Sequence, residues 1–124
     1  MQTDTFFQMF ARQRLFSSRV LSSKNEDVSL LETKERLSKE YLFALMNEIS
    51  EVAKTFNWKY HKNSRQDVNY PELKEELIDV FKYLLTLVII WDIKPEEFIE
   101  EFYRKSAVVE QRFDSEQGTT SAQG

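Results

Sequence analysis

The chain has 124 residues, enough for one domain with its own core, and contains only two Gly and two Pro. So few turn residues argue against an all-β fold. The absence of Cys excludes disulfides and thiolate metal sites, and the single His, His61, excludes a multi-His metal centre. The net charge of −4 gives no general attraction to nucleic acid.

The chain shows no sign of secretion or membrane insertion. Its N-terminus lacks the basic region and apolar core of a signal peptide. The longest apolar run, residues 83–91, is interrupted by Thr86 and is too short to span a bilayer. We therefore expect a soluble, cytoplasmic protein that binds neither membrane nor nucleic acid.

Helical spacing of apolar residues predicts two helices in the first half of the chain. The first begins after Asp4, its N-cap, and runs to about residue 21. The second begins near residue 30, because Ser29 and Glu32 have the spacing of a capping box, and extends to residue 56 either without interruption or with a break near Ser38. Its apolar face consists of Leu37, Tyr41, Leu45, Val52 and Phe56.

Proline positions mark the two helices of the second half. Pro71, preceded by Asn69, begins a helix that runs to Trp91, and Pro95 begins a helix that runs to about residue 113. Residues 114–124 lack apolar side chains apart from one alanine, and we expect them to form a disordered tail after a 1–113 domain.

The sequence thus predicts an all-α bundle of about four main helices. Residues 77–91 are apolar on nearly all sides, which in a soluble protein is typical of a helix buried on most sides. One chain has few helices with which to surround it. We therefore expect the bundle to be completed by oligomerisation, as a homodimer or homotetramer.

Two pairs of carboxylates stand out within this pattern: Glu48 with Glu51, and Glu76 with Asp79. Members of each pair are three apart and so share a helix face, with Cβ atoms about 5–6 Å from one another. If the two helices face each other, the four like charges repel unless something compensates them. A hard cation such as Mg²⁺ is one solution, and ion pairs with Lys or Arg are the other.

Further side chains have both a binding and a structural interpretation. Trp58, beside Lys59 and Lys62, could stack a base and hold phosphates, or could cap the core with its lysines solvated. Lys105 and Arg112, seven apart and so on one helix face, could bind phosphate or pair with neighbouring glutamates. Gln13 could read a base or lie on the surface.

The spacing of the acids resembles a known signature. EISE at 48–51, then twenty-four residues, then ELID at 76–79 resembles the E-x-x-E…E-x-x-D pattern of the all-α nucleoside triphosphate pyrophosphohydrolases. That superfamily includes the dimeric dUTPases and the MazG-like enzymes, and the long gap is more similar to the dimeric dUTPase branch. Residues 102–112 resemble that branch's phosphate-binding helix, and the first helix, with Gln13 and Arg19, is similar to its base-binding helix.

This resemblance implies a Mg²⁺-dependent enzyme that hydrolyses a (deoxy)nucleoside triphosphate to the monophosphate and pyrophosphate, in nucleotide pool sanitation. The metal ligands would hold two or three Mg²⁺ ions, for which Mn²⁺ can substitute: Glu48, Glu51, Glu76 and Asp79. Glu48 or Glu51 would also activate the attacking water. The expected substrate-binding residues are Gln13, Phe16, Trp58, Lys59, Lys62, Lys105 and Arg112. The competing hypothesis is a non-catalytic helical protein that serves oligomerisation or regulation.

The base-reading positions depart from the dUTPase pattern. Phe16 stands where that branch has an Asn that reads uracil, and Ser106 and Val109 stand for two Asn on the last helix. Amides that hydrogen-bond a base are the strongest source of discrimination between similar ligands. The sequence therefore leaves dUTP, dCTP and a purine dNTP open as substrates.

Overall fold

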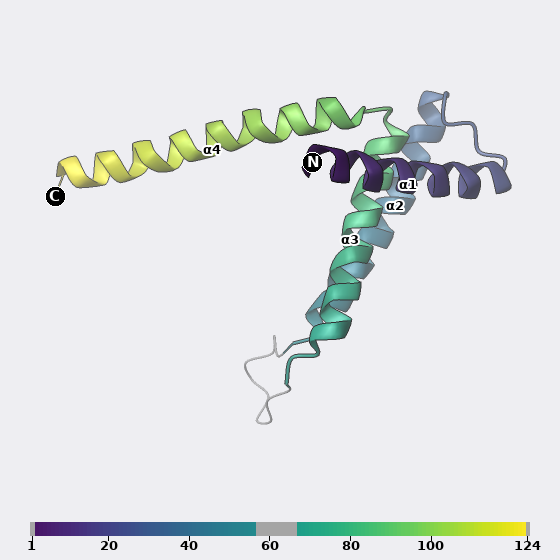
Figure 1. The fold of residues 1–124 in the computed structure, drawn as a ribbon, viewed down its shortest axis with the longest axis horizontal. Helices are drawn as coiled ribbons and strands as arrows, with labels where there is room; N and C mark the ends of the chain where they lie inside the picture. The colour runs from purple at the N-terminus through teal and green to yellow at the C-terminus, as the bar shows by residue number, and fades with distance from the viewer. Residues whose placement is uncertain (1, 57–66, 124) are drawn as a thin grey trace. The chain divides into compact units, whose positions relative to one another are not determined.

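The computed structural model describes residues 2–56 and 67–123, and within these ranges the regular structure is entirely helical. Its helices are α1 (Gln2–Ser23), α2 (Leu31–Ala53), α3 (Tyr70–Ile90) and α4 (Pro95–Gln123). They are coloured from purple to yellow along the chain in Figure 1. The predicted all-α class is confirmed. None of the described helices is long and apolar enough to cross a membrane.

Local side-chain and backbone bonds fix the helix ends. After α1, Asn25 takes a left-handed conformation with φ of 55°, and the N–H of Glu26 donates to the carbonyl of Leu21 at 3.0 Å, as in a Schellman motif. Asn69 caps α3, as predicted, by accepting a hydrogen bond from the backbone N–H of Glu72 at 3.2 Å.

The predicted capping box before α2 is wrong. The Ser29 hydroxyl donates to the Asp27 carboxylate instead, and Leu30 occupies the N-cap without a side-chain bond. The two bonds from Ser29, through its hydroxyl and its backbone N–H, lower the pKa of Asp27. A carboxylate two residues away is therefore the partner of this hydroxyl, in place of the helix N–H groups.

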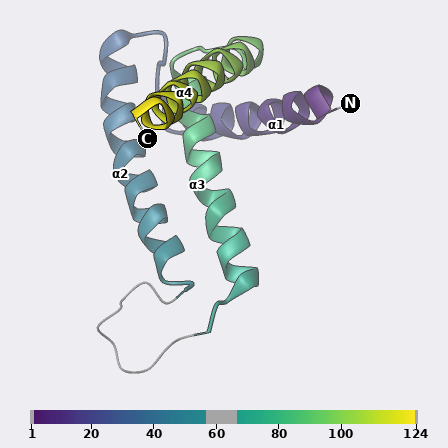
Figure 2. The same ribbon diagram turned by 90° about the vertical axis from the view of Figure 1, so that its left-hand side faces the viewer.

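Residues 2–92 form one compact unit, in which α2 and α3 lie side by side and α1 packs on α3 (Figure 2). A core cluster joins the three helices through Leu21, Leu37 and Ile90. Two polar contacts reinforce it. The ammonium of Lys34 donates to the carbonyl of Ile90 at 2.8 Å, and the indole of Trp91 donates to Ser38 Oγ at 2.7 Å.

Burial of α3 within the chain is uneven. Its buried residues lie in the C-terminal half, where Leu85 and Ile90 are nearly inaccessible, whereas Leu77 and Ile78 near the N-terminus remain 50% and 52% exposed. On α2 the exposed large apolar residues are Leu31, Leu42, Phe43, Met46 and Ile49. Within the described residues of this unit, the N-terminal half of α3 therefore keeps apolar side chains exposed.

Residues 93–124 form the second unit, which contains helix α4. The helix continues to Gln123, whereas we expected a disordered tail from Asp114. Side chains 114–118 are exposed, so no burial holds this stretch of helix. The division into a 1–113 domain and a tail stays a prediction.

Candidate functional site

Three carboxylates converge where α2 faces α3. Glu48 comes from α2, and Glu76 and Asp79 lie one helical turn apart on α3. One carboxylate oxygen from each residue lies within 4.8 Å of the other two. The i, i+3 spacing places the α3 pair on one face, and the side-by-side packing of α2 and α3 brings Glu48 to it.

The cluster is electrostatically crowded. Burial of the Glu76 carboxyl raises its pKa, and so do a hydrogen bond with Glu48 and repulsion from Asp79, Glu48 and Glu51. In the described parts of the chain, no lysine or arginine forms an ion pair with Glu48, Glu76 or Asp79. The local negative charge is therefore not balanced by ion pairs there.

Glu51 differs from the other three predicted ligands. Its carboxylate accepts a bond from Lys54 Nζ at 3.1 Å, and it is not among the three converging oxygens. It nevertheless lies close enough for its charge to raise the pKa of Glu76. A cation that competes with Lys54 for this carboxylate would bring a fourth oxygen ligand to the cluster.

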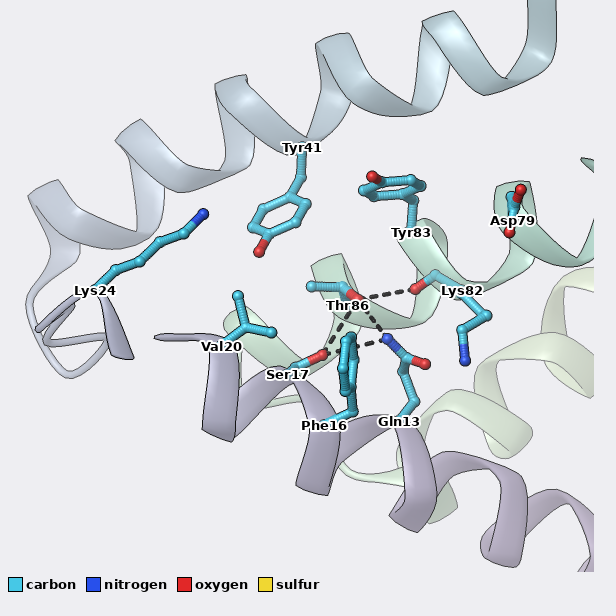
Figure 3. Close-up of a pocket in the computed structure, with 10 residues that line it drawn as sticks. All are labelled: Gln13, Phe16, Ser17, Val20, Lys24, Tyr41, Asp79, Lys82, Tyr83 and Thr86. Carbon is cyan, nitrogen blue, oxygen red and sulfur yellow. Dashed lines mark hydrogen bonds between the residues drawn. The ribbon is translucent and has the colours of Figure 1, made fainter. Parts of the chain in front are cut away.

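The acid cluster adjoins a pocket of about 330 Å³ between α1, α2 and α3 (Figure 3). Asp79 belongs to both, so the carboxylates lie at one edge of the pocket. The walls are mixed, with aromatic rings, two lysines and a group of small polar side chains. The lining residues are Gln13, Phe16, Ser17, Val20, Lys24, Tyr41, Asp79, Lys82, Tyr83 and Thr86.

A buried polar group forms the floor of this pocket where α1 meets α3. The amide nitrogen of Gln13 lies 3.1 Å from Thr86 Oγ1 and 3.3 Å from Ser17 Oγ. These bonds are drawn as dashed lines in Figure 3. The amide oxygen of Gln13, in contrast, is buried and has no hydrogen-bond partner among the described residues. The pocket thus combines an acidic edge with a buried group of polar side chains where α1 meets α3.

A family model described as dUTPase matches residues 5–122, nearly the whole chain. The chain belongs to the dUTPase family. The resemblance drawn from the two acid motifs is thereby confirmed, together with a nucleotide pyrophosphohydrolase type of function. No curated protein and no solved structure matches the chain.

Within this dUTPase family member, the other predicted substrate-binding residues are placed as follows. Gln13 and Phe16 both line the pocket beside the acids. Lys105 and Arg112 lie exposed on α4, in the second unit. The predictions for Trp58, Lys59 and Lys62 fall outside the described residues.

Sequence reasoning missed several residues of the pocket. Tyr41 and Tyr83 were read as core residues, yet their rings, 5.9 Å apart, form part of its wall. Lys82 and Thr86 lie on the same face of α3 as Asp79. Thr86 carried a signal, because it interrupts the apolar run of residues 83–91 with an aliphatic hydroxyl. Lys24 follows directly after α1, and nothing in the sequence pattern indicated that it would line a pocket.

Proposed function

We propose that this dUTPase family member is a Mg²⁺-dependent pyrophosphohydrolase that converts a (deoxy)nucleoside triphosphate to the monophosphate and pyrophosphate. The observation that carries the proposal is the convergence of Glu48, Glu76 and Asp79 beside a pocket. The size of that pocket, about 330 Å³, suits a small molecule such as a nucleoside.

The donor set fits a hard divalent cation. Glu48, Glu76 and Asp79 offer oxygen ligands only, and Mg²⁺ and Mn²⁺ prefer such ligands. With Glu51 as the fourth ligand, the four acids would hold two or three ions. When bound, the metal neutralises charge on phosphate oxygens and lowers the pKa of bound water. Burial first, and then the neighbouring carboxylates, raise the pKa of Glu76, and a bound cation would relieve the repulsion among these carboxylates.

Side chains of the protein are assigned to water activation and to phosphate binding. Glu48 or Glu51 orients and deprotonates the attacking water, which is general base catalysis. Lys82 lines the pocket on the same α3 face as Asp79, which suits an ammonium that binds phosphate oxygens. Lys59, Lys62, Lys105 and Arg112 are proposed to bind outer phosphate oxygens, and Trp58 to stack on the base or sugar.

The base end of the substrate is assigned to Gln13 and Phe16. Both lie on α1 and line the pocket whose other edge holds Asp79. A nucleotide bound with its phosphates at the carboxylates would therefore extend its base toward α1. The base itself, whether of dUTP, dCTP or a purine dNTP, is left to the assay below.

We also propose that the protein works as a homodimer or homotetramer in the cytoplasm. Leu42, Phe43, Met46 and Ile49 are exposed apolar residues on α2, and Leu77 and Ile78 are exposed on α3. Large exposed apolar patches mark interaction sites. A second copy of the chain would bury these side chains.

Pyrophosphate release tests the proposed reaction. The protein is incubated with each common NTP and dNTP, including dUTP, in the presence of Mg²⁺, Mn²⁺ or a chelator. The proposal expects metal-dependent release from at least one of these nucleotides. Absence of release from all of them with either metal would favour the non-catalytic, oligomerising protein instead.

A further inference from the structure

Contacts between α2 and α3 recur at a regular interval along both helices. Each step of seven residues forward along α2 is matched by a step of seven residues backward along α3, if the residues just beyond the facing helix ends are included. The pairs are Lys34 with Ile90, Tyr41 with Tyr83, Glu48 with Glu76, and Thr55 with Asn69. Seven residues are nearly two helical turns, or about 10.5 Å, so the pairs follow one face of each helix. The two helices are thus packed antiparallel in a single register.

The pairs at the two ends of this series are hydrogen bonds to backbone groups. The ammonium of Lys34 donates to the carbonyl of Ile90 at 2.8 Å, and the backbone N–H of Asn69 donates to the carbonyl of Thr55 at 2.9 Å. Ile90 is the last residue of α3. Its carbonyl therefore lacks a partner within the helix and lies at the negative end of the helix dipole, which favours an ammonium.

The inner pair Glu48 and Glu76 brings like charges together. One carboxylate oxygen from each, and one from Asp79, lie within 4.8 Å of one another. Such carboxylates repel each other, so their repulsion favours any displacement that separates α2 from α3 at this level. A slip of one helical turn, about 5.4 Å, would be enough to disperse the three oxygens.

The contacts along the series differ in how well they resist such a displacement. Apolar packing, such as that between the rings of Tyr41 and Tyr83 (Figure 3), is not directional. Hydrogen bonds are directional and require an N···O distance of about 2.7–3.2 Å. The bonds of Lys34 and Asn69 therefore oppose sliding of the helices more strictly than the rings between them do.

We propose that Lys34 and the backbone N–H of Asn69 are positioning groups that fix the register of α2 on α3 and so hold Glu48 opposite Glu76 before a metal binds. Lys34 lies fourteen residues from Glu48 along α2, about 21 Å, and Asn69 lies seven residues from Glu76. Both act on the site through the helices. Without either bond, a metal would have to draw the carboxylates together, which lowers its affinity. This inference rests on the proposed metal-dependent hydrolysis.

The test is Mn²⁺ binding without nucleotide, measured from the electron paramagnetic resonance signal of free Mn²⁺. Lys34→Met keeps the aliphatic stem and removes the donor. The bond from the Trp91 indole to Ser38 holds the same end of the helix pair, so the variant should stay folded. Its Kd for Mn²⁺ should rise by about threefold to tenfold, the ratio that corresponds to one typical hydrogen bond.

Pyrophosphate release gives a second readout of the same variant. The Mg²⁺ concentration that gives half-maximal rate should rise by the same factor as the Kd for Mn²⁺. At saturating Mg²⁺ the metal has drawn the carboxylates together, so kcat should stay within about twofold of the wild-type value. A purely structural role for Lys34 would change the Tm without changing either metal dependence.

Two control variants separate positioning from charge. Lys34→Arg keeps a cationic donor and should restore the wild-type Kd. Lys39→Met removes an exposed lysine that lies closer to Glu48 along α2. Loss of a positive charge by itself favours cation binding, so Lys39→Met should leave the Kd unchanged or slightly lower. A higher Kd in Lys34→Met then has the opposite sign to the effect of charge.

Asn69 provides an independent comparison at the other end of the helix pair. Asn69→Ala and Asn69→Pro both lose the side-chain cap of α3, but only proline also lacks the N–H that donates to Thr55. We expect Asn69→Pro to raise the Kd for Mn²⁺ by about threefold to tenfold relative to Asn69→Ala.

Each outcome decides one claim. A raised Kd in Lys34→Met and Asn69→Pro, with wild-type binding in Lys34→Arg, supports the inference. An unchanged Kd in either folded variant would overturn the role of that group and leave the hydrolysis intact, and so would a raised Kd in Lys34→Arg or Lys39→Met for Lys34. Absence of both Mn²⁺ binding and pyrophosphate release in the wild-type protein would overturn the proposed function itself.

Discussion

Replacing Gln13 by methionine should raise the stability of the protein and weaken its binding of substrate. Gln13 is buried, and its amide oxygen has no hydrogen-bond partner in the part of the chain that the structure describes. Methionine has a similar length and a flexible apolar side chain that fills irregular space. The substitution therefore removes the unpaired acceptor without opening a large cavity.

The expected change in stability is the difference between the cost of the unsatisfied oxygen and the contribution of the hydrogen bonds that the substitution removes. An unsatisfied buried polar atom costs about 1–3 kcal/mol, and a typical hydrogen bond contributes about 0.5–1.5 kcal/mol. Gln13→Met loses two bonds of 3.1 and 3.3 Å, which belong at the weak end of that range. Ser17 and Thr86 keep each other as partners, and Thr86 keeps the carbonyl of Lys82, so no new atom is orphaned. The net gain is about 1 kcal/mol.

Thermal unfolding at fixed protein concentration measures this gain. For a domain of this size, 1 kcal/mol corresponds to an increase in Tm of roughly 3–6 °C. Gln8→Met, an exposed glutamine on the same helix, is the matched control and should change stability by less than about 0.5 kcal/mol. A fall in Tm for Gln13→Met would mean that the amide oxygen is already satisfied in solution. An unchanged KM for nucleotide would remove Gln13 from the binding site.

Three further predictions concern the scaffold and the assembly. Asn69→Ala removes the side-chain cap of α3 and should cost about 1 kcal/mol in thermal unfolding, whereas an unchanged Tm would show that the cap does not contribute. Leu85→Ala truncates a side chain that is only 2% exposed and should cost about 2–5 kcal/mol in urea unfolding; a loss below 1 kcal/mol would contradict the core assignment. Phe43→Glu places a charge on a position that is 72% exposed, and should shift sedimentation toward monomer with unchanged helical circular dichroism. If the sedimentation of Phe43→Glu matched that of the wild-type protein, this surface would not be the oligomer interface.

The helices were predictable because their signals are local. Apolar spacing and the pairing of Asn69 with Pro71 depend on residues a few positions apart, and the structure places α3 within one residue of the predicted bounds at both ends. Ser29 shows where local reasoning fails. Its spacing from Glu32 fits a capping box, but Asp27 offers a closer charged acceptor for the hydroxyl. Competition between two local partners is not visible in a spacing rule.

The site was predictable only in part, because some of its contacts join residues that are far apart in the sequence. The i, i+3 spacing of Glu76 and Asp79 indicates a shared face, and the structure adds Glu48 from α2 at that face. The bond between Glu51 and Lys54 also joins residues three apart. The spacing alone did not predict it, because the two side chains can adopt other rotamers in which they do not meet. The contact between Gln13 and Thr86 spans 73 positions and depends on how α1 packs on α3, so a single sequence gives no measure of it.

The central claim is that the converging acids hold a metal that the reaction needs. Its most direct test is pyrophosphate release in the presence of Mg²⁺ by Asp79→Asn, with Glu75→Gln as the control. Glu75 is an exposed acid on the same helix, outside the three-carboxylate cluster. The account predicts that Asp79→Asn keeps its helical circular dichroism but loses turnover and the rise in Tm caused by Mg²⁺ with nucleotide, while Glu75→Gln behaves as the wild-type protein does. Wild-type turnover by Asp79→Asn would contradict the metal assignment.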